Sequence, residues 1–390
     1  MNEPTQSPES SSKREFEQGP IRPPSEARSL LVRVTRNCHW NRCTFCPVYK
    51  GTRFSVRPVE DVLADLDAVA IHVESLSRMS AGTPDLFEAS LREHLRSLPP
   101  DEQLSFRAAL LWFVAGMESV FLQDADALAV KPPRLLRILT HLHARFPSVK
   151  RVTAYGRSDT IDRIAPDDLR ALREAGLDRV HVGMESGCDR VLERVHKKVT
   201  REEHVRAGLK VKAAGMELSV YYMPGLGGRD LYRENAVETA EAVSRINPHF
   251  VRLRTLALPD RAPLAQEARE GRFSACGDVL TAQEIRLFLE GLDGCDGYLA
   301  NDHVLNLLPE VEGWLSRDRE RMVGVADRFL ALDPDRRALF QLGRRLGFLA
   351  TLADLDDPTR MAQVVGAAQE LGATRENVDE IVETAIKRYI

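Results

Sequence analysis

The chain has 390 residues, of which 43% are hydrophobic and 29% charged, and its formal net charge is −4 at pH 7. These values are typical of a globular protein and argue against a globally basic nucleic-acid binder, so we expect no nucleic-acid partner. No apolar run reaches the roughly 18 residues that a membrane-spanning helix needs, so no membrane span is expected.

The first part of the chain, residues 1–28, is rich in Ser, Pro and Glu and poor in large apolar groups. Such a stretch cannot bury enough surface to offset the entropy cost of ordering, which predicts a disordered tail. Its start lacks the basic residues and the apolar core of a secretory signal. We therefore expect a cytoplasmic protein in a reducing compartment, where clustered cysteines bind metal or do redox work rather than form disulfides.

Three of the six cysteines follow directly after the apolar run 30–34, within nine residues and in the pattern C-x4-C-x2-C. They are Cys38, Cys43 and Cys46. An iron–sulfur cluster normally takes four cysteines, so three thiolates predict a cluster with one coordination position open for another molecule. A structural zinc site is the alternative. Tetrahedral zinc needs a fourth Cys or His, and His39 is badly placed because it adjoins Cys38.

Strand and helix patterns alternate over much of the chain. The predicted strands are 29–35, 119–123, 151–155, 179–184, 217–223 and 250–256. Such alternation builds a parallel sheet with helices outside it, so we predict an α/β fold, a partial (β/α)6 TIM-type barrel over residues 29–260. Helical signals over 77–116 exceed what a crossover needs and predict an insertion. Strand signals stop after residue 258, and a helical C-terminal region is predicted over 261–390, with a helix across 301–331.

Polar and glycine residues recur where the predicted strands end, which is where parallel α/β sheets carry their active groups. They are Asp124, Asp126, Arg157, Ser158, Glu185, Gly225, Arg252 and Arg254. Each also has a structural interpretation: the aspartates as helix caps, Arg157 as a surface residue, Glu185 as a strand-end cap. These residues are candidates for contact with the molecule that fills the open position.

A first strand that ends in C-x4-C-x2-C, with Phe45 before the last cysteine and βα units after it, resembles the radical S-adenosylmethionine (radical SAM) superfamily over residues 29 to about 258. It is most similar to the branch of the elongator catalytic subunit and oxygen-independent coproporphyrinogen oxidase. The resemblance implies that the three cysteines hold a [4Fe–4S] cluster whose open iron binds SAM. Reductive cleavage of SAM would give a 5′-deoxyadenosyl radical that abstracts hydrogen from the substrate, which requires an external reductant such as flavodoxin or ferredoxin.

The family's usual spacing is C-x3-C-x2-C, so the extra residue here predicts a bulge near Trp40-Asn41. The resemblance also implies roles for the candidates. The ammonium or ribose of SAM would contact Asp124, Asp126 and Glu185, and its ribose or carboxylate would contact Arg157 and Ser158. Its adenine would lie against Gly225. SAM or the substrate would contact Arg252 and Arg254, and Phe45 would shield the cluster.

Other features remain open. His303 is a candidate general acid or base, although a satisfied cap or core histidine is the preferred interpretation. The remaining cysteines are too few for a second cluster, and the basic stretch 194–212 is typical of solvated helix faces. We predict an enzyme acting on an unidentified small molecule. The alternatives are a tRNA-modifying radical SAM enzyme, a zinc-stabilised non-catalytic binding protein, and a catalytically inactive scaffold.

Overall fold

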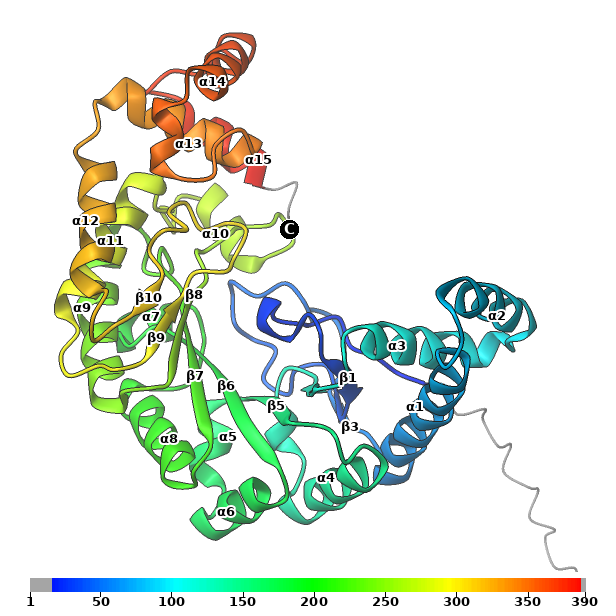
Figure 1. The fold of residues 1–390 in the computed structure, drawn as a ribbon. Helices are drawn as coiled ribbons and strands as arrows, with labels where there is room; N and C mark the ends of the chain where they lie inside the picture. The colour runs from blue at the N-terminus through cyan, green and yellow to red at the C-terminus, as the bar shows by residue number, and fades with distance from the viewer. Residues whose placement is uncertain (1–15, 387–390) are drawn as a thin grey trace, which may run out of the picture.

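The computed structural model describes residues 16–386, and its centre is one eight-stranded sheet (Figure 1). The strands, in spatial order, are β1 (Leu30–Arg33), β4 (Ser119–Gln123), β5 (Arg151–Gly156), β6 (Leu177–Glu185), β7 (Glu217–Tyr222), β8 (Phe250–Leu253), β9 (Tyr298–Ala300) and β10 (Gly313–Trp314). Each neighbouring pair from β1 to β9 is parallel, and β10 runs antiparallel to β9. The predicted partial barrel with parallel strands is confirmed.

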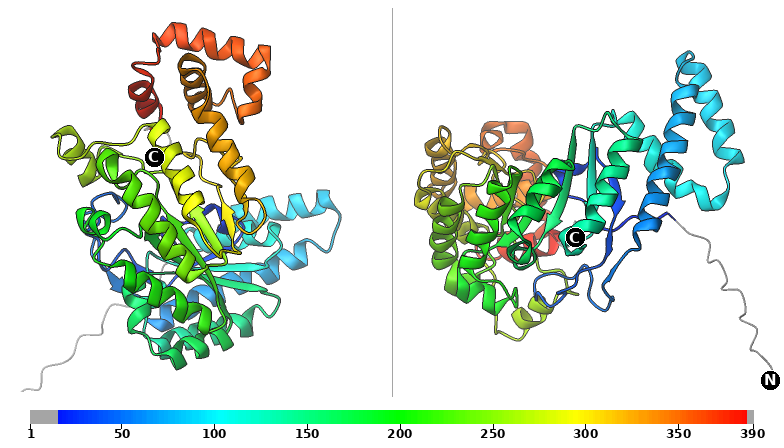
Figure 2. Two further views of the ribbon diagram at one scale, coloured as in Figure 1. Left: turned by 90° about the vertical axis from the view of Figure 1, so that its left-hand side faces the viewer. Right: turned by 90° about the horizontal axis from the view of Figure 1, so that it is seen from below.

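Helices cover the outside of the arc that the strands form (Figures 1 and 2). They are α1 (Val59–Met79), α4 (Pro132–Arg145), α5 (Ser158–Arg163), α6 (Pro166–Glu174), α7 (Asp189–Arg194), α8 (Arg201–Ala213) and α9 (Gly228–Ile246). Local sequence explains their ends. Thr200 and Glu203 form a capping box at the start of α8, and α6 starts at a proline followed by two aspartates. Strands β4 and β5 are almost wholly buried, because helices pack on one face and ring side chains such as Phe121 and Tyr155 pack together on the other.

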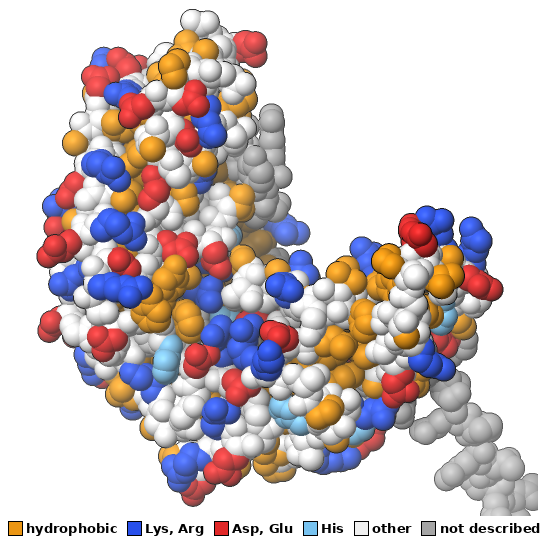
Figure 3. Space-filling model, viewed as in Figure 1, with side chains coloured by type: hydrophobic (Ala, Val, Ile, Leu, Met, Phe, Trp, Pro, Cys, Tyr) orange, Lys and Arg blue, Asp and Glu red, His pale blue; other side chains and the backbone are white. Residues whose placement is uncertain are grey.

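The predicted insertion consists of α2 (Pro84–Ser97), a short 3-10 turn and α3 (Gln103–Val114). Helix α2 has no buried residue and projects from the barrel (Figure 2). Apolar side chains gather over α2 and α3 in the space-filling view (Figure 3). Leu86 of α2 and Leu104 and Leu111 of α3 are exposed. Helix α2 therefore adds little to the core, whereas α3 buries Phe106, Ala109 and Trp112 in the main core.

Residues 16–28 correct one prediction, since a disordered tail was expected through residue 28. Phe16 is buried in the main core, and the amide of Gly19 donates to Oε1 of Gln123 over 2.9 Å. Glu26 is fully buried, where Arg151 and Ser29 contact its carboxylate at 3.1 and 2.6 Å. Composition predicted disorder, but specific polar contacts to the sheet order this segment. Residues 1–15, the rest of the predicted tail, lie outside the described residues.

The C-terminal region corrects a second prediction. Its helices are α10 (Pro263–Arg269), α11 (Asp278–Gly291), α12 (Arg319–Leu330), α13 (Pro334–Leu346), α14 (Pro358–Leu371) and α15 (Val378–Ile386). The helix expected over 301–331 begins only at Arg319, and β9 and β10 add two strands that the sequence did not predict. These strands have three and two residues, too few to show a periodic pattern. Between them, the side chain of Asn301 donates to the carbonyl of Leu308 over 2.6 Å and holds a loop.

None of the helices in residues 16–386 is both long enough and apolar enough to cross a membrane.

Candidate functional site

A cavity of about 450 Å³ lies where the parallel strands end. The loops after β1 and after each of β4 to β9 contribute to its wall, as expected for an α/β barrel. Seven predicted site residues line it: Cys38, Cys43, Cys46, Phe45, Arg157, Glu185 and Arg254. The fold therefore gathers residues that are more than 200 positions apart in the chain at one place.

The cysteine loop reaches across the top of the barrel. The amide of Thr44 donates to the carbonyl of Val195 over 3.0 Å, and the amide of Leu264 donates to the carbonyl of Thr44 over 2.9 Å. Trp40 Nε1 donates to the carbonyl of His196 over 2.7 Å. Asn41 has a left-handed φ of 45°, a conformation that asparagine tolerates, at the position where the sequence predicts the bulge. These contacts fix the loop in spite of its extra residue.

The three thiols of the cysteine loop lie on one wall of the cavity. All three are free, and burial raises the pKa of Cys46, with smaller contributions from the charges of Cys43 and Cys38 nearby. Among residues 16–386, no three His, Cys, Asp or Glu side chains are grouped so that they could hold one metal ion. In a cluster each cysteine binds a different iron, so the ligands stand farther apart than around one zinc. Three free thiols on one wall of the cavity are the ligand set that the predicted cluster needs.

Glu185 is the carboxylate that faces this cavity. It ends β6, has a left-handed φ of 67°, and coincides with a shift in the β6–β7 register. Its Oε1 accepts from Nζ of Lys197 at 3.3 Å, and Lys197 is 6% exposed. The sequence assigned Lys197 to a solvated helix face, whereas the structure makes it the partner of Glu185. A carboxylate with spare lone pairs in a largely apolar cavity can accept hydrogen bonds from a cationic ligand.

The two predicted aspartates lie outside the cavity lining, which corrects their assignment. Asp124 is fully buried and accepts from Tyr49 Oη at 2.5 Å and from Arg33 Nε at 3.0 Å. Asp126 is also fully buried and accepts from Thr160 Oγ1 at 2.6 Å. Burial raises the pKa of Asp126 to about 7, although its hydrogen bonds oppose that shift. Their lone pairs are used within the protein, so the structure gives them a structural role.

Ser158 and Arg252 also lie outside the lining. Ser158 Oγ is hydrogen-bonded to Nδ1 of the buried His204 at 2.7 Å. Arg252 Nε donates to Ser219 Oγ over 3.1 Å, and its Nη1 pairs with Asp302 at 2.9 Å. Ser158 was predicted to contact SAM and Arg252 to contact SAM or the substrate, but their partners hold both inside the wall of the barrel.

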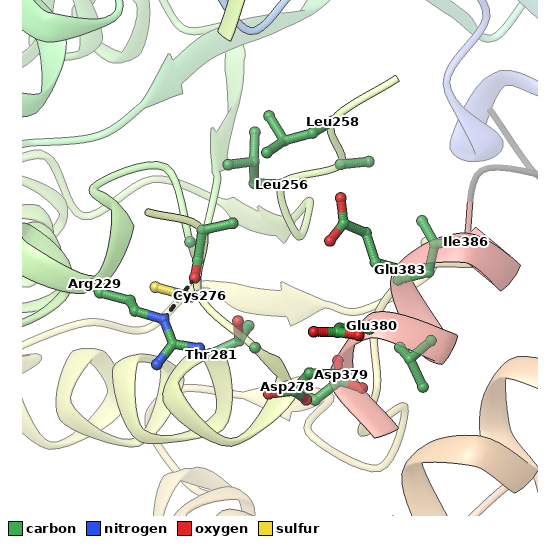
Figure 4. Close-up of a pocket in the computed structure, with 15 residues that line it drawn as sticks. Arg229, Leu256, Leu258, Cys276, Asp278, Thr281, Asp379, Glu380, Glu383 and Ile386 are labelled. Atoms are coloured by element: carbon green, nitrogen blue, oxygen red, sulfur yellow. Dashed lines mark hydrogen bonds between the residues drawn. The ribbon is translucent and has the colours of Figure 1, made fainter. Parts of the chain in front are cut away.

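Gly225 lines a second, smaller cavity of about 210 Å³ (Figure 4). This cavity lies between the loop after β7, the start of α11 and helix α15, which brings Glu380, Glu383 and Ile386 to it. The amide of Gly225 donates to Oε2 of the buried Glu284 over 2.9 Å. Gly225 therefore lines this second cavity and not the cysteine cavity, whereas it was predicted to lie against the adenine of SAM.

The far end of the main cavity is lined by residues that follow β8 and β9. Arg254 Nη1 pairs with Oδ1 of Asp302 at 2.8 Å, and the guanidinium lies 5.0 Å from the ring centroid of Tyr221. His303 also lines the cavity, so the preferred interpretation of a satisfied cap or core histidine is wrong. Burial, and next the charge of Arg254, lower the pKa of His303 to about 4.

Sequence reasoning missed several wall residues, notably Tyr155, Tyr221, Lys197 and Met223. Tyr155 and Tyr221 face each other from β5 and β7, with their hydroxyl oxygens 3.4 Å apart. Tyr155 ends a predicted strand and Tyr221 lies two residues before the end of another, so their position near the carboxyl edge was available as a signal. Lys197 had no comparable signal, because its burial depends on the path of the chain after α7.

Comparison with known proteins agrees with the resemblance to the radical SAM superfamily. The model of the Radical SAM superfamily matches residues 32–241, more than half of the chain. Among curated proteins, none matches the sequence.

Solved structures with a similar fold include three of known source. The archaeal Methanocaldococcus infernus Elp3 with an N-terminal deletion is 14% identical with a TM-score of 0.40, over 49% of this chain and 50% of that one. The radical S-adenosylmethionine methyltransferase TsrM from Kitasatospora setae, with cobalamin and a [4Fe-4S] cluster bound, is 14% identical with a TM-score of 0.45, over 88% and 62%. Coproporphyrinogen III oxidase (HemN) from Escherichia coli, a radical SAM enzyme, is 16% identical with a TM-score of 0.44, over 67% and 52%. The chain thus spans between half and two thirds of the length of these three proteins.

Proposed function

Because the chain belongs to the radical SAM superfamily, an enzyme family that uses a [4Fe–4S] cluster and SAM, we propose that it is a radical SAM enzyme for a small-molecule substrate. One observation supports this most directly. Cys38, Cys43 and Cys46 line the same cavity as Glu185 and Arg157, although these groups come from three different strand ends.

We propose that the three cysteines are the cluster ligands and that Phe45 shields the cluster from water. Phe45 packs among apolar side chains that include Leu226 and Leu264, so its ring is held in place. A dry shell around an iron–sulfur cluster tunes its potential. When bound, the cluster and SAM would supply the reductive cleavage that gives a 5′-deoxyadenosyl radical, which abstracts hydrogen from the substrate.

Glu185 and Arg157 would orient SAM. Glu185 offers a carboxylate to its ammonium group, while Lys197 holds that carboxylate at 3.3 Å. Arg157 is itself fixed, because its Nε donates to Asp159 over 2.9 Å and its Nη2 to the carbonyl of Lys197 over 3.0 Å. Asp126 accepts from the amide of Arg157 at 3.3 Å, so we assign it the task of shaping this loop rather than contacting SAM.

The sequence left other functions open. A tRNA substrate would require a basic surface or RNA-binding module, and the stretch 194–212 places its Lys197 inside the cavity instead of on a solvated face. A zinc-stabilised binding protein would need a fourth Cys or His ligand beside the three thiols, and metal analysis separates it from the cluster. A catalytically inactive scaffold differs from an enzyme only in activity, which the experiment measures.

The test is anaerobic purification followed by metal analysis and incubation of the reduced protein with SAM. We expect a brown protein with about four irons per chain and formation of 5′-deoxyadenosine. The Cys43→Ala variant should lack both. A colourless protein with one zinc would refute the proposal, and a full complement of iron without 5′-deoxyadenosine would support the scaffold.

A further inference from the structure

A group of charged and polar side chains lies at the β8–β9 end of the main cavity, far along the sheet from the cysteine loop. Asp302 bridges two arginines: its Oδ2 is 2.9 Å from Arg252 Nη1, and its Oδ1 is 2.8 Å from Arg254 Nη1. Two guanidinium groups thus share one carboxylate. Lys197 and Glu185 cancel each other elsewhere in the cavity. The buried group of Arg252, Arg254 and Asp302 therefore keeps one positive charge, and the exposed Arg261 adds a second, solvated charge to the same wall.

Two nitrogen atoms in this group lack partners. Among residues 16–386, neither Arg254 Nη2 nor His303 Nδ1 has a hydrogen-bond partner, although both atoms are buried. An unsatisfied buried polar group costs about 1–3 kcal/mol, so each such group in a native protein needs an explanation. Both residues line the cavity, and a ligand with acceptor oxygens placed there would satisfy them.

The segment that carries His303 is fixed from outside the cavity. Arg345 on α13 donates to the carbonyl of Leu305 over 2.6 Å, and its other nitrogen pairs with the buried Asp278 at 2.5 Å. Asn306 Oδ1 accepts from the amide of Thr255 at 3.0 Å, which ties the segment to the loop after β8. The donors are therefore held in position before a ligand binds, which lowers the cost of binding.

The neighbouring wall is apolar. Leu256, Pro259 and Leu305 line the same end of the cavity as Arg254 and His303. Pockets for small molecules commonly combine such apolar walls with a few convergent polar groups that set orientation.

We propose that Arg254 and His303 bind a carboxylate of the substrate, so that the enzyme acts on a small carboxylic acid with an apolar body. The inference rests on the proposed function and names its substrate class. The one buried positive charge that Asp302 does not offset matches the single negative charge of a carboxylate, whereas a phosphate would add a second one; the charge of Arg261 on this wall is exposed and screened by solvent. The low pKa of His303 keeps its imidazole neutral at pH 7, where it serves as a hydrogen-bond donor beside the arginine.

SAM also has a carboxylate, and it is the other source of the same chemistry. The residues proposed for SAM lie at the ends of β5 and β6: Arg157 follows β5 and Glu185 ends β6. Arg254 and His303 follow β8 and β9, which come later in the strand order of the sheet. The experiment must therefore separate binding of SAM from binding of a second carboxylate.

The probe is fluoroacetate, small enough for any part of the cavity, followed by fluorine NMR with the cluster-loaded full-length chain and SAM present. Fluoroacetamide is the neutral match. We expect fluoroacetate to bind and fluoroacetamide not to bind. The Arg254→Gln variant should lower the affinity for fluoroacetate about tenfold, the effect of losing one charge-assisted hydrogen bond. The control is Arg261→Gln, which removes an exposed arginine from the same cavity wall and should change affinity less than about threefold.

Four outcomes would overturn the proposal. They are no binding of fluoroacetate, equal weakening by the two variants, tighter binding of inorganic phosphate than of fluoroacetate, and competition between SAM and fluoroacetate. Loss of SAM affinity in Arg254→Gln by equilibrium dialysis would likewise assign the arginine to SAM. The proposed function fails separately, if the wild-type protein makes no 5′-deoxyadenosine while it still binds fluoroacetate through Arg254.

Discussion

The two ends of the strand arc are built in different ways. At the β1 end, the cysteines that define the site lie within nine residues, and one loop carries all of them. At the β8–β9 end, Arg252, Arg254, Asp302 and His303 come from two strand ends about fifty residues apart, and Arg345 on α13 holds the second segment. A local motif can thus be identified from the sequence, while a site assembled from distant segments cannot.

The same difference separates the acids. Glu185 faces the cavity, whereas Asp124, Asp126 and Glu284 are fully buried and bonded within the protein. Asp124, Asp126 and Glu185 lie at strand ends, and Glu284 on α11 contacts the loop that follows β7. Their functions diverge because packing decides which carboxylate keeps free lone pairs. The following predictions test this division between the two ends and between the two kinds of acid.

The largest effect is expected at the cysteine end. Cys46→Ala removes one ligand of the cluster, so iron should fall from about four per chain to near zero. Cys276→Ala is the matched control, because Cys276 lines the second cavity and should leave the iron unchanged. Iron analysis and visible absorption check both variants. Equal iron content in the two variants would contradict the assignment of the cluster to the cysteine loop.

A second variant disturbs the β8–β9 end alone. Arg345→Met leaves the carboxylate of Asp278 buried without the arginine that pairs with it at 2.5 Å. Breaking such a buried pair costs about 3–5 kcal/mol of the free energy of unfolding, measurable by urea denaturation. The double variant Arg345→Met with Asp278→Asn should recover part of that loss. Iron content should stay near the wild-type value, and a parallel loss of iron would show that the two ends are not independent.

The buried acid Glu284 should make stability depend on pH. Burial raises its pKa from 4.5 to about 7, although Tyr222, Asn235 and the amide of Gly225 donate to it. The folded protein then binds more protons than the unfolded chain, so this contribution is full below pH 4.5 and is lost as the pH rises to about 7. The loss is on the order of 3 kcal/mol.

Glu284→Gln removes this titration. The free energy of unfolding of the wild type, relative to the variant, should therefore fall between pH 4.5 and 7 in urea denaturation. The control is Glu383→Gln, which changes an exposed acid beside the second cavity and should leave the pH profile unchanged. A relative stability that rises with pH would contradict the raised pKa.

The smallest effect is expected for the acid in the cavity. Glu185→Gln keeps the size of the side chain but loses one charge-assisted hydrogen bond, so SAM should bind about tenfold more weakly. The free energy of unfolding should fall as well, because the variant leaves the buried Lys197 without the carboxylate that pairs with it at 3.3 Å. Equilibrium dialysis with SAM measures the first effect, and Glu193→Gln, an exposed acid on α7, is the control. Unchanged affinity for SAM would remove Glu185 from the site.

The sequence by itself determined the cysteine loop, the alternating strands and helices, and hence the family and the partial barrel. These features are local: a nine-residue motif and patterns that repeat within each strand or helix. It also placed Glu185 at the strand end where the structure finds it in the cavity.

Only the tertiary structure decided which strand-end residues face the cavity. In the structure, partners inside the protein bind Asp124, Asp126, Ser158 and Arg252. Gly225 lines the second cavity, and His303 and Lys197 line the first. The tertiary structure also ordered residues 16–28 and added β9 and β10 to the sheet. The physical reason is common to all of these changes: hydrogen-bond partners and burial depend on segments far away in the chain, which no local pattern encodes.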